Sequence, residues 1–123
     1  MAQKYIEGDL VRYTSLYKEP IAEICEVRET SYLIRFMNGN FAKVTSQEIK
    51  PIPLTPEILE KNGWNKGQIY FTHSRIPRIK LCTDGGISWS VSINNDIMGG
   101  YISYVHELQH ILFAFKITSE MEV

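Results

Sequence analysis

The sequence predicts an α+β fold of mostly antiparallel short strands, with one short central helix and a C-terminal amphipathic helix. Short runs rich in β-branched and aromatic residues alternate with turn signals, which is typical of antiparallel sheets. Residues 103–115 instead repeat apolar side chains at steps of three and four, the spacing of one helix face. With 123 residues and 44% hydrophobic content, the chain fits a single compact, soluble domain over 1–123, with subregions 1–54 and 55–123.

The N-terminal subregion predicts a meander of strands at 6–13, 21–27, 32–36 and 41–44. Asn38-Gly39 lies between the last two strands, and both residues tolerate the positive φ of a tight hairpin turn. Four or five short strands in about 50 residues favour an SH3-like barrel or a curled sheet for 1–54.

The central helix is framed by its end signals. Thr55 is a suitable N-cap, and Pro56 suits the first helical position, where an amide donor would have no partner. Asn62-Gly63 is a C-terminal stop, so the helix is expected over 56–61. The preceding residues 51–54 should be extended because two prolines interrupt them.

A second β region follows this helix. It predicts strands at 69–72, 79–83 and 87–93, with a tight turn at 84–86 and loops at 94–96 and 99–100. Apolar residues alternate with serine over 87–93, so we expect the serines on a solvent-facing side. The last helix is expected from about Ser103, as its cap, to Phe115.

The segment His106-Glu107-Leu108-Gln109-His110 matches H-E-x-x-H. Histidines four apart on a helix can bind zinc together, and the glutamate between them can activate a zinc-bound water. One interpretation is therefore a zinc-dependent metallopeptidase with Glu107 as catalytic base, His106 and His110 as ligands and His73 as a third ligand. Glu120 and Glu122 are other third-ligand candidates.

Two observations favour a non-enzymatic protein without a cofactor. Phe113 and Lys116 stand where a longer zinc-peptidase pattern has glycine and a third histidine. On a helical wheel the histidines lie almost opposite the apolar stripe, which predicts that they face solvent. Phe113 lies on the histidine side, where it marks a candidate interface or second buried surface.

Residues 51–64, together with 104–109 and the aromatic helix that follows, resemble a group of small uncharacterised proteins from Bacteroides-type bacteria and their phages. In that group asparagine often stands at the position of His110 and phenylalanine at that of Trp64. The resemblance implies that residues 104–109 are a helix-docking signature and not a peptidase signature. It also implies a phage or mobile-element accessory protein directed at a host.

Charge is unevenly distributed along the chain. The net charge of −1 argues against a wholly basic nucleic-acid-binding domain. Residues 61–83 contain five Lys/Arg and no acidic residue. With neighbouring aromatic rings they could bind an anionic nucleotide or nucleic acid, whereas the alternative is a solvated strand face. The candidate ligand-binding residues are Lys66, Tyr70, His73, Arg75, Arg78 and Lys80.

The remaining expectations concern cellular context. The first residues lack the apolar core of a signal peptide, and no apolar run approaches the length that spans a bilayer. Cys25 and Cys82 form no disulfide or metal pattern, so reduced thiols in a cytoplasm, bacterial or of an infected host cell, are expected. The partner is another protein or an anionic small ligand rather than a membrane, and oligomerisation stays open.

Overall fold

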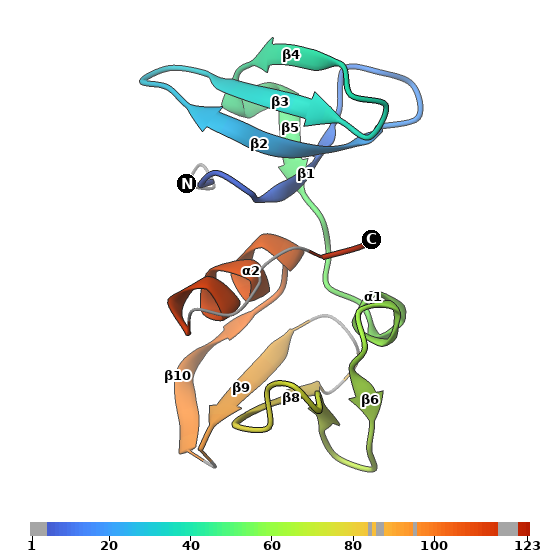
Figure 1. Cartoon of the computed structure of the whole chain (residues 1–123), viewed down its shortest axis with the longest axis vertical. Coiled ribbons are helices and arrows are strands. Elements are labelled where there is room, and N and C mark those ends of the chain that lie inside the picture. Colours follow the sequence, from blue (N-terminus) through green and yellow to red (C-terminus); the bar gives the residue numbers. More distant parts are fainter. Residues whose placement is uncertain (1–4, 84, 86–87, 95, 116–120) are drawn as a thin grey trace.

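Two five-stranded antiparallel sheets lie at opposite ends of the molecule, with the C-terminal helix between them (Figure 1). This arrangement comes from a computed structural model that describes residues 5–83, 85, 88–94, 96–115 and 121–123. Strands and a few helices mix along the chain, and every strand pairing among the described residues is antiparallel, so the predicted α+β class is confirmed.

The N-terminal sheet is a meander whose last strand returns to its first. Its strands are β1 (Leu10–Tyr13), β2 (Ile21–Val27), β3 (Tyr32–Phe36), β4 (Phe41–Val44) and β5 (Ile49–Pro51), with a 3₁₀ helix, η1 (Ser46–Glu48), before β5. The order is β4-β3-β2-β1-β5, so β4 and β5 are the two edges. Gly39, with φ of +91°, supplies the left-handed residue of the β3–β4 turn, as the Asn-Gly signal predicts.

The C-terminal sheet follows a short helix. The elements are α1 (Pro56–Lys61), β6 (Asn65–Lys66), β7 (Phe71–Thr72), β8 (Ile79–Thr83), β9 (Trp89–Ile93), β10 (Asp96–Ile102) and α2 (Val105–Ala114). The sheet order is β10-β9-β8-β7-β6. The bounds of α1 are those predicted, and the Thr55 hydroxyl accepts the Ile58 amide at 3.2 Å as the cap.

Several predicted boundaries in this half are wrong. The strand expected at 69–72 contains only Phe71–Thr72, and Asn65–Lys66 pairs with it as an unforeseen edge strand. The loop expected at 99–100 lies inside β10, whose register against β9 shifts between Ile97 and Tyr101. Ser92 was expected in solvent and is only 7% exposed on the central strand β9. Residues 84, 86–87 and 95 of the predicted turns and strand lie outside the described residues.

The N-cap of the C-terminal helix lies one residue later than predicted. Pro53 and Tyr104 form a β-bridge, and the Val105 amide donates to the Ile52 carbonyl at 2.8 Å. Because Tyr104 pairs in extended conformation with the segment between β5 and α1, Ser103 and Tyr104 are not part of the helix. Tyr104 is therefore the N-cap in place of Ser103.

Each sheet has its own hydrophobic cluster. The smaller cluster fills the N-terminal sheet: Tyr5, Val11, Ala22, Ile24, Ile34, Val44 and Ile49. The larger cluster joins the C-terminal sheet to α1, to α2 and to the linker after β5: Leu10, Ile52, Leu54, Leu59, Trp64, Phe71, Ile76, Ile79, Leu81, Trp89, Val91, Val105, Leu108 and Leu112. Leu10 of β1 belongs to the larger cluster, so the two sheets share apolar packing at their junction. Within the described ranges, no helix is long and apolar enough to cross a bilayer.

Candidate functional site

The face of α2 that carries the two histidines lies against the N-terminal sheet. His106 and Gln109 are each 2% exposed, so the prediction that this face points into solvent is wrong. The wheel places Val105, Leu108 and Leu112 correctly in the larger cluster. It assumes, however, that only one face of the helix is covered, whereas α2 lies between two sheets (Figure 1).

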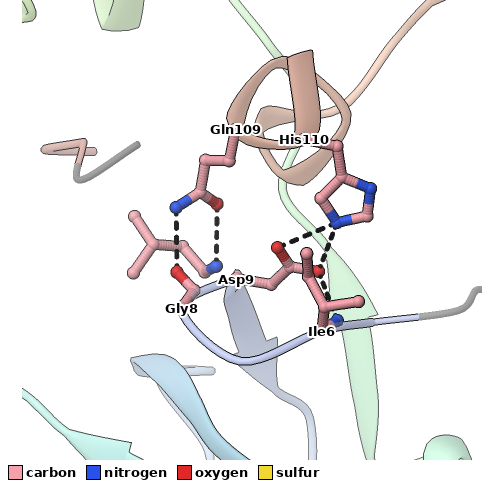
Figure 2. Close-up of polar contacts among 6 residues, drawn as sticks. Ile6, Gly8, Asp9, Gln109 and His110 are labelled. Atoms are coloured by element: carbon pink, nitrogen blue, oxygen red, sulfur yellow. Dashed lines mark hydrogen bonds and ion pairs between the residues drawn. The ribbon is translucent and has the colours of Figure 1, made fainter. Parts of the chain in front are cut away.

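Gln109 joins the helix to the first strand through both ends of its carboxamide. Its Oε1 accepts the Leu10 amide at 3.0 Å, and its Nε2 donates to the Gly8 carbonyl at 2.9 Å, as Figure 2 shows. Gly8 belongs to the turn that leads into β1, and Leu10 is the first residue of that strand. The side chain thereby satisfies buried backbone groups that a neighbouring strand would otherwise pair.

Asp9 lies beside this contact and pairs with His110. The Asp9 side chain is 2% exposed, and its two carboxylate oxygens lie 3.0 and 2.8 Å from His110 Nε2 (Figure 2). One of these oxygens also accepts the Ile6 amide at 2.9 Å. Gly8, with φ of +93°, allows the chain to turn back so that this bond forms. Both oxygens of the Asp9 carboxylate are therefore occupied by hydrogen bonds within the chain.

His106 is enclosed by aromatic rings. The centroid of its ring lies 5.0 Å from that of Tyr5, 5.9 Å from that of Tyr104 and 5.5 Å from that of His110. Its Nδ1 is buried without a hydrogen-bond partner among the described residues. Burial lowers the pKa of His106 below its ordinary 6.5, with the nearby His110 acting in the same direction and Asp9 against it. Burial likewise raises the pKa of Tyr5 to about 12, with smaller contributions from Tyr32 and Asp9.

Glu107 is occupied at the start of its own helix. Its Oε1 accepts the Ser103 amide at 2.9 Å and the Tyr104 amide at 3.1 Å. A glutamate at the third helical position commonly satisfies amides in this way. This geometry holds the Glu107 carboxylate on the backbone at the N-terminal end of α2. It does not place the carboxylate as a catalytic base between the two histidines.

His73 belongs to a different part of the molecule. Its Nδ1 accepts the Arg75 amide and its Nε2 faces the Asn62 carbonyl, both at 3.1 Å, so the ring is fixed as the Nε2–H tautomer. It also lies against Trp64, and a side chain at Gly63 would approach its Nε2 to 2.9 Å. The contacts of His73 are with α1 and its flank, and those of His106 and His110 are with the β1 turn.

The predicted ligand set is therefore not assembled. Of the other third-ligand candidates, Glu120 lies outside the described residues, and the backbone of Glu122 contacts Asn62 near α1. Over the described ranges, no three His, Cys, Asp or Glu side chains are placed to hold a metal ion. Within the described ranges, His110 Nε2 is paired with Asp9, Glu107 is bound to backbone amides, and His106 is packed among aromatic rings with its Nδ1 unpartnered.

The basic segment is spread over two faces of its sheet. Lys66 pairs across strands with Phe71 and Lys80 with Thr72; consecutive residues of a strand face opposite sides. Lys66 and Lys80 therefore lie on opposite faces of the sheet. The Lys80 ammonium lies 5.5 Å from the centroid of the Tyr70 ring, and Arg78 lies at the same distance from that of Phe115. Arg75 is exposed, and His73 is engaged as above.

Two shallow grooves lie on the N-terminal half. Phe113, the candidate interface residue, is 67% exposed and lines a groove of about 430 Å³ with Tyr5, Ile6, Glu7 and Val27. A larger groove of about 620 Å³, here called the β1–β4 groove, was not foreseen. Its lining residues are Leu16, Pro20, Ile21, Phe36, Met37, Asn38, Asn40 and Phe41. A signal for it was present, since Met37 and Phe41 flank the Asn-Gly turn, where large apolar residues have no packing role.

Substituting Gln109→Leu tests the contact between α2 and β1. The change keeps the side-chain volume but leaves the Leu10 amide and the Gly8 carbonyl unpaired, so we expect the free energy of unfolding to fall by about 2–3 kcal/mol. Urea denaturation followed by circular dichroism measures this difference. The matched control Gln68→Leu, at an exposed position, should change it by about 0.5 kcal/mol or less. Equal stabilities of the two variants would contradict the assignment.

The buried His106 predicts loss of stability in acid. Its pKa is lower in the folded chain than in the unfolded chain, so its contribution is complete above about pH 6.5 and is lost as the pH falls through the folded pKa. Urea denaturation at several pH values between 7.5 and 5 should show this fall, and His106→Phe should reduce its slope. Phenylalanine suits the aromatic surroundings and removes the unpaired nitrogen. Identical slopes for the two proteins would show that His106 does not titrate as described.

Comparison with known proteins identifies no relative. No family model matches the chain, and neither the search of curated proteins nor the search of solved structures gives a match. The functional interpretation therefore depends on the geometry described above.

Proposed function

We propose that this chain is a non-enzymatic accessory protein that binds another protein through the β1–β4 groove. The observation that carries the proposal is the gathering of three exposed large apolar side chains around one groove. Leu16 is 53% exposed, Met37 69% and Phe41 60%. Exposed apolar clusters of this kind are typical of protein interaction sites, because binding a partner removes their apolar surface from water.

The surroundings of the groove also favour a protein partner. Tyr17, next to Leu16 in the β1–β2 connection, is 97% exposed, and large aromatic residues are enriched where interfaces form. Asn38 and Asn40 add amide groups at the rim, which can pair with a partner's backbone. β4, which begins at Phe41, is an edge strand, so an extended segment of the partner could add to it while placing side chains in the groove.

The strand order supports a more specific proposal for this half, namely that it is an SH3-like curled sheet. Four strands form a meander, a 3₁₀ helix follows β4, and β5 returns to pair with β1. The β1–β2 connection and the β3–β4 turn then lie side by side and line the groove. We also propose, from the resemblance of the two sequence blocks, that the protein is encoded by a phage or mobile element and acts on a host protein in the cytoplasm.

Placing a photo-crosslinking amino acid at Tyr17 in cells of a Bacteroides-type bacterium should identify the partner. With the purified partner, Met37→Ser and Phe41→Ser should each weaken binding by about tenfold or more, because each removes a large apolar contact. Isothermal titration calorimetry measures the affinities. The matched control is Phe113→Ser, which removes an equally exposed apolar residue from the other groove and should leave the affinity unchanged. Loss of binding only in the control would exclude the β1–β4 groove as the site.

The metallopeptidase alternative is tested by metal analysis. Protein prepared without a histidine tag and dialysed after incubation with zinc should hold much less than one zinc per chain, because His110 is paired with Asp9 and Glu107 is bound to backbone amides. Inductively coupled plasma mass spectrometry measures the content. Stoichiometric zinc that is lost in both His106→Ala and His110→Ala would establish the metal site, and peptide hydrolysis lost with Glu107→Ala would establish the enzyme.

A further inference from the structure

The edge strand β4 has one open side, and the ladder that joins it to β3 determines which backbone groups point there. The Phe36 amide donates to the Asn40 carbonyl at 2.8 Å, so these residues are a hydrogen-bonded pair in the register that continues through Arg35 and Phe41. Hydrogen-bonded and non-hydrogen-bonded pairs alternate along an antiparallel ladder. Phe41 and Lys43 therefore occupy non-hydrogen-bonded positions, and their amide and carbonyl groups point away from β3. Figure 1 shows β4 at the far edge of the sheet, away from α2.

The side chains of Phe41 and Lys43 lie on one face of this edge, because alternate residues of a strand point to the same side. Phe41 is 60% exposed and lines the β1–β4 groove, and Lys43 is exposed beside it. Ala42 between them is half-buried and packs against the smaller hydrophobic cluster. The open edge thus presents an apolar and a cationic side chain two positions apart.

The charge of Lys43 is not neutralised within the part of the chain that the structure describes. Arg35, the cation opposite Phe41, lies 2.6 Å from the carboxylate of Glu23. Lys43 takes part in none of the ion pairs among the described residues, and β4 contains no acidic residue. A second copy that paired through β4 would therefore bring another uncompensated lysine to the same interface. The charge favours a partner with an acidic residue opposite Lys43.

We propose that the partner of the β1–β4 groove contributes an extended segment that pairs antiparallel with β4, with an acidic residue opposite Lys43 and a large apolar residue opposite Phe41. The antiparallel sense is that of the described pairings in this sheet and is the more stable one per residue. Because the two strands run in opposite directions, the acidic residue comes first in the segment and the apolar residue two positions later.

The bound segment satisfies three features of the edge at once. Its backbone pairs with the outward amide and carbonyl groups of β4, its apolar side chain covers Phe41 at the groove, and its carboxylate pairs with Lys43. The inference rests on the proposed function, to which it adds the conformation and the residue pattern of the bound segment.

Selection from a phage-displayed library of random peptides of about twelve residues, with the full chain as the target, tests the residue pattern. We expect the recovered peptides to carry Asp or Glu two positions before a large apolar residue. With Lys43→Glu as the target, Lys or Arg should replace the acidic residue, because the charge that it faces is reversed. The matched control Lys66→Glu, at an exposed position on the edge strand β6 of the other sheet, should select the same pattern as the unmodified chain.

The results separate a failure of this inference from a failure of the proposed function. Apolar peptides without the acidic residue, recovered by the unmodified chain and by Lys43→Glu but not by Phe41→Ser, would overturn the pattern and leave the groove as the site. Peptides that bind Phe41→Ser as tightly as the unmodified chain would exclude the groove itself. Recovery of no peptide would overturn the extended segment. Dimers of the unmodified chain that Phe41→Ser dissociates in size-exclusion chromatography would overturn it in favour of a second copy.

Synthetic versions of a recovered peptide test the strand pairing without altering the protein. Residues opposite each other at a hydrogen-bonded position exchange both backbone bonds, so methylation of the apolar residue's nitrogen removes the donor to the Phe41 carbonyl. Fluorescence anisotropy should then show binding weakened by about tenfold or more. Methylation of the nitrogen one residue earlier, which points away from β4, should change the affinity by about twofold or less. Equal affinities of the two methylated peptides would overturn the pairing with β4.

Discussion

The contact between Gln109 and the turn before β1 is the constraint on which the arrangement of the two sheets depends. One carboxamide pairs with both a backbone amide and a backbone carbonyl from the opposite end of the sequence, and the Asp9–His110 pair lies directly beside it. Because α2 buries Val105, Leu108 and Leu112 in the larger cluster, these polar bonds place the N-terminal sheet on the opposite side of the same helix. The burial of Tyr5 and His106 follows from that position.

Local signals predicted the parts of the fold that local interactions determine. Thr55, Pro56 and Asn62 frame α1 at the predicted residues, and Asn38-Gly39 marks the β3–β4 turn. The α2 start was misplaced because Tyr104 pairs with Pro53, a contact between residues distant in the sequence. β6 and β10 were missed for a similar reason, since a two-residue strand and a strand that contains two glycines are held by their neighbours and have weak propensity of their own.

The candidate site, too, depends on contacts between residues that are distant in the sequence, which local patterns do not predict. The pattern H-E-x-x-H specifies which groups share a helix face, but it contains no information on what covers that face. Glu107 serves the helix start, and Asp9 reaches His110 from far away in the sequence. The β1–β4 groove could have been suspected from Met37 and Phe41 beside an exposed turn. The Asn62 contact with Glu122 could not, because an asparagine after a helix ordinarily indicates only a helix stop.

The separation of 99 residues between Leu10 and Gln109 has a consequence for how the protein is made. During synthesis the residues of the N-terminal sheet emerge from the ribosome well before those of α2. Until α2 arrives, the Asp9 carboxylate lacks its contact with His110 and the Tyr5 ring lacks its contact with His106. The newly made sheet therefore passes through a period in which a polar and aromatic surface is open to chaperones and other chains, and the arrival of α2 closes it.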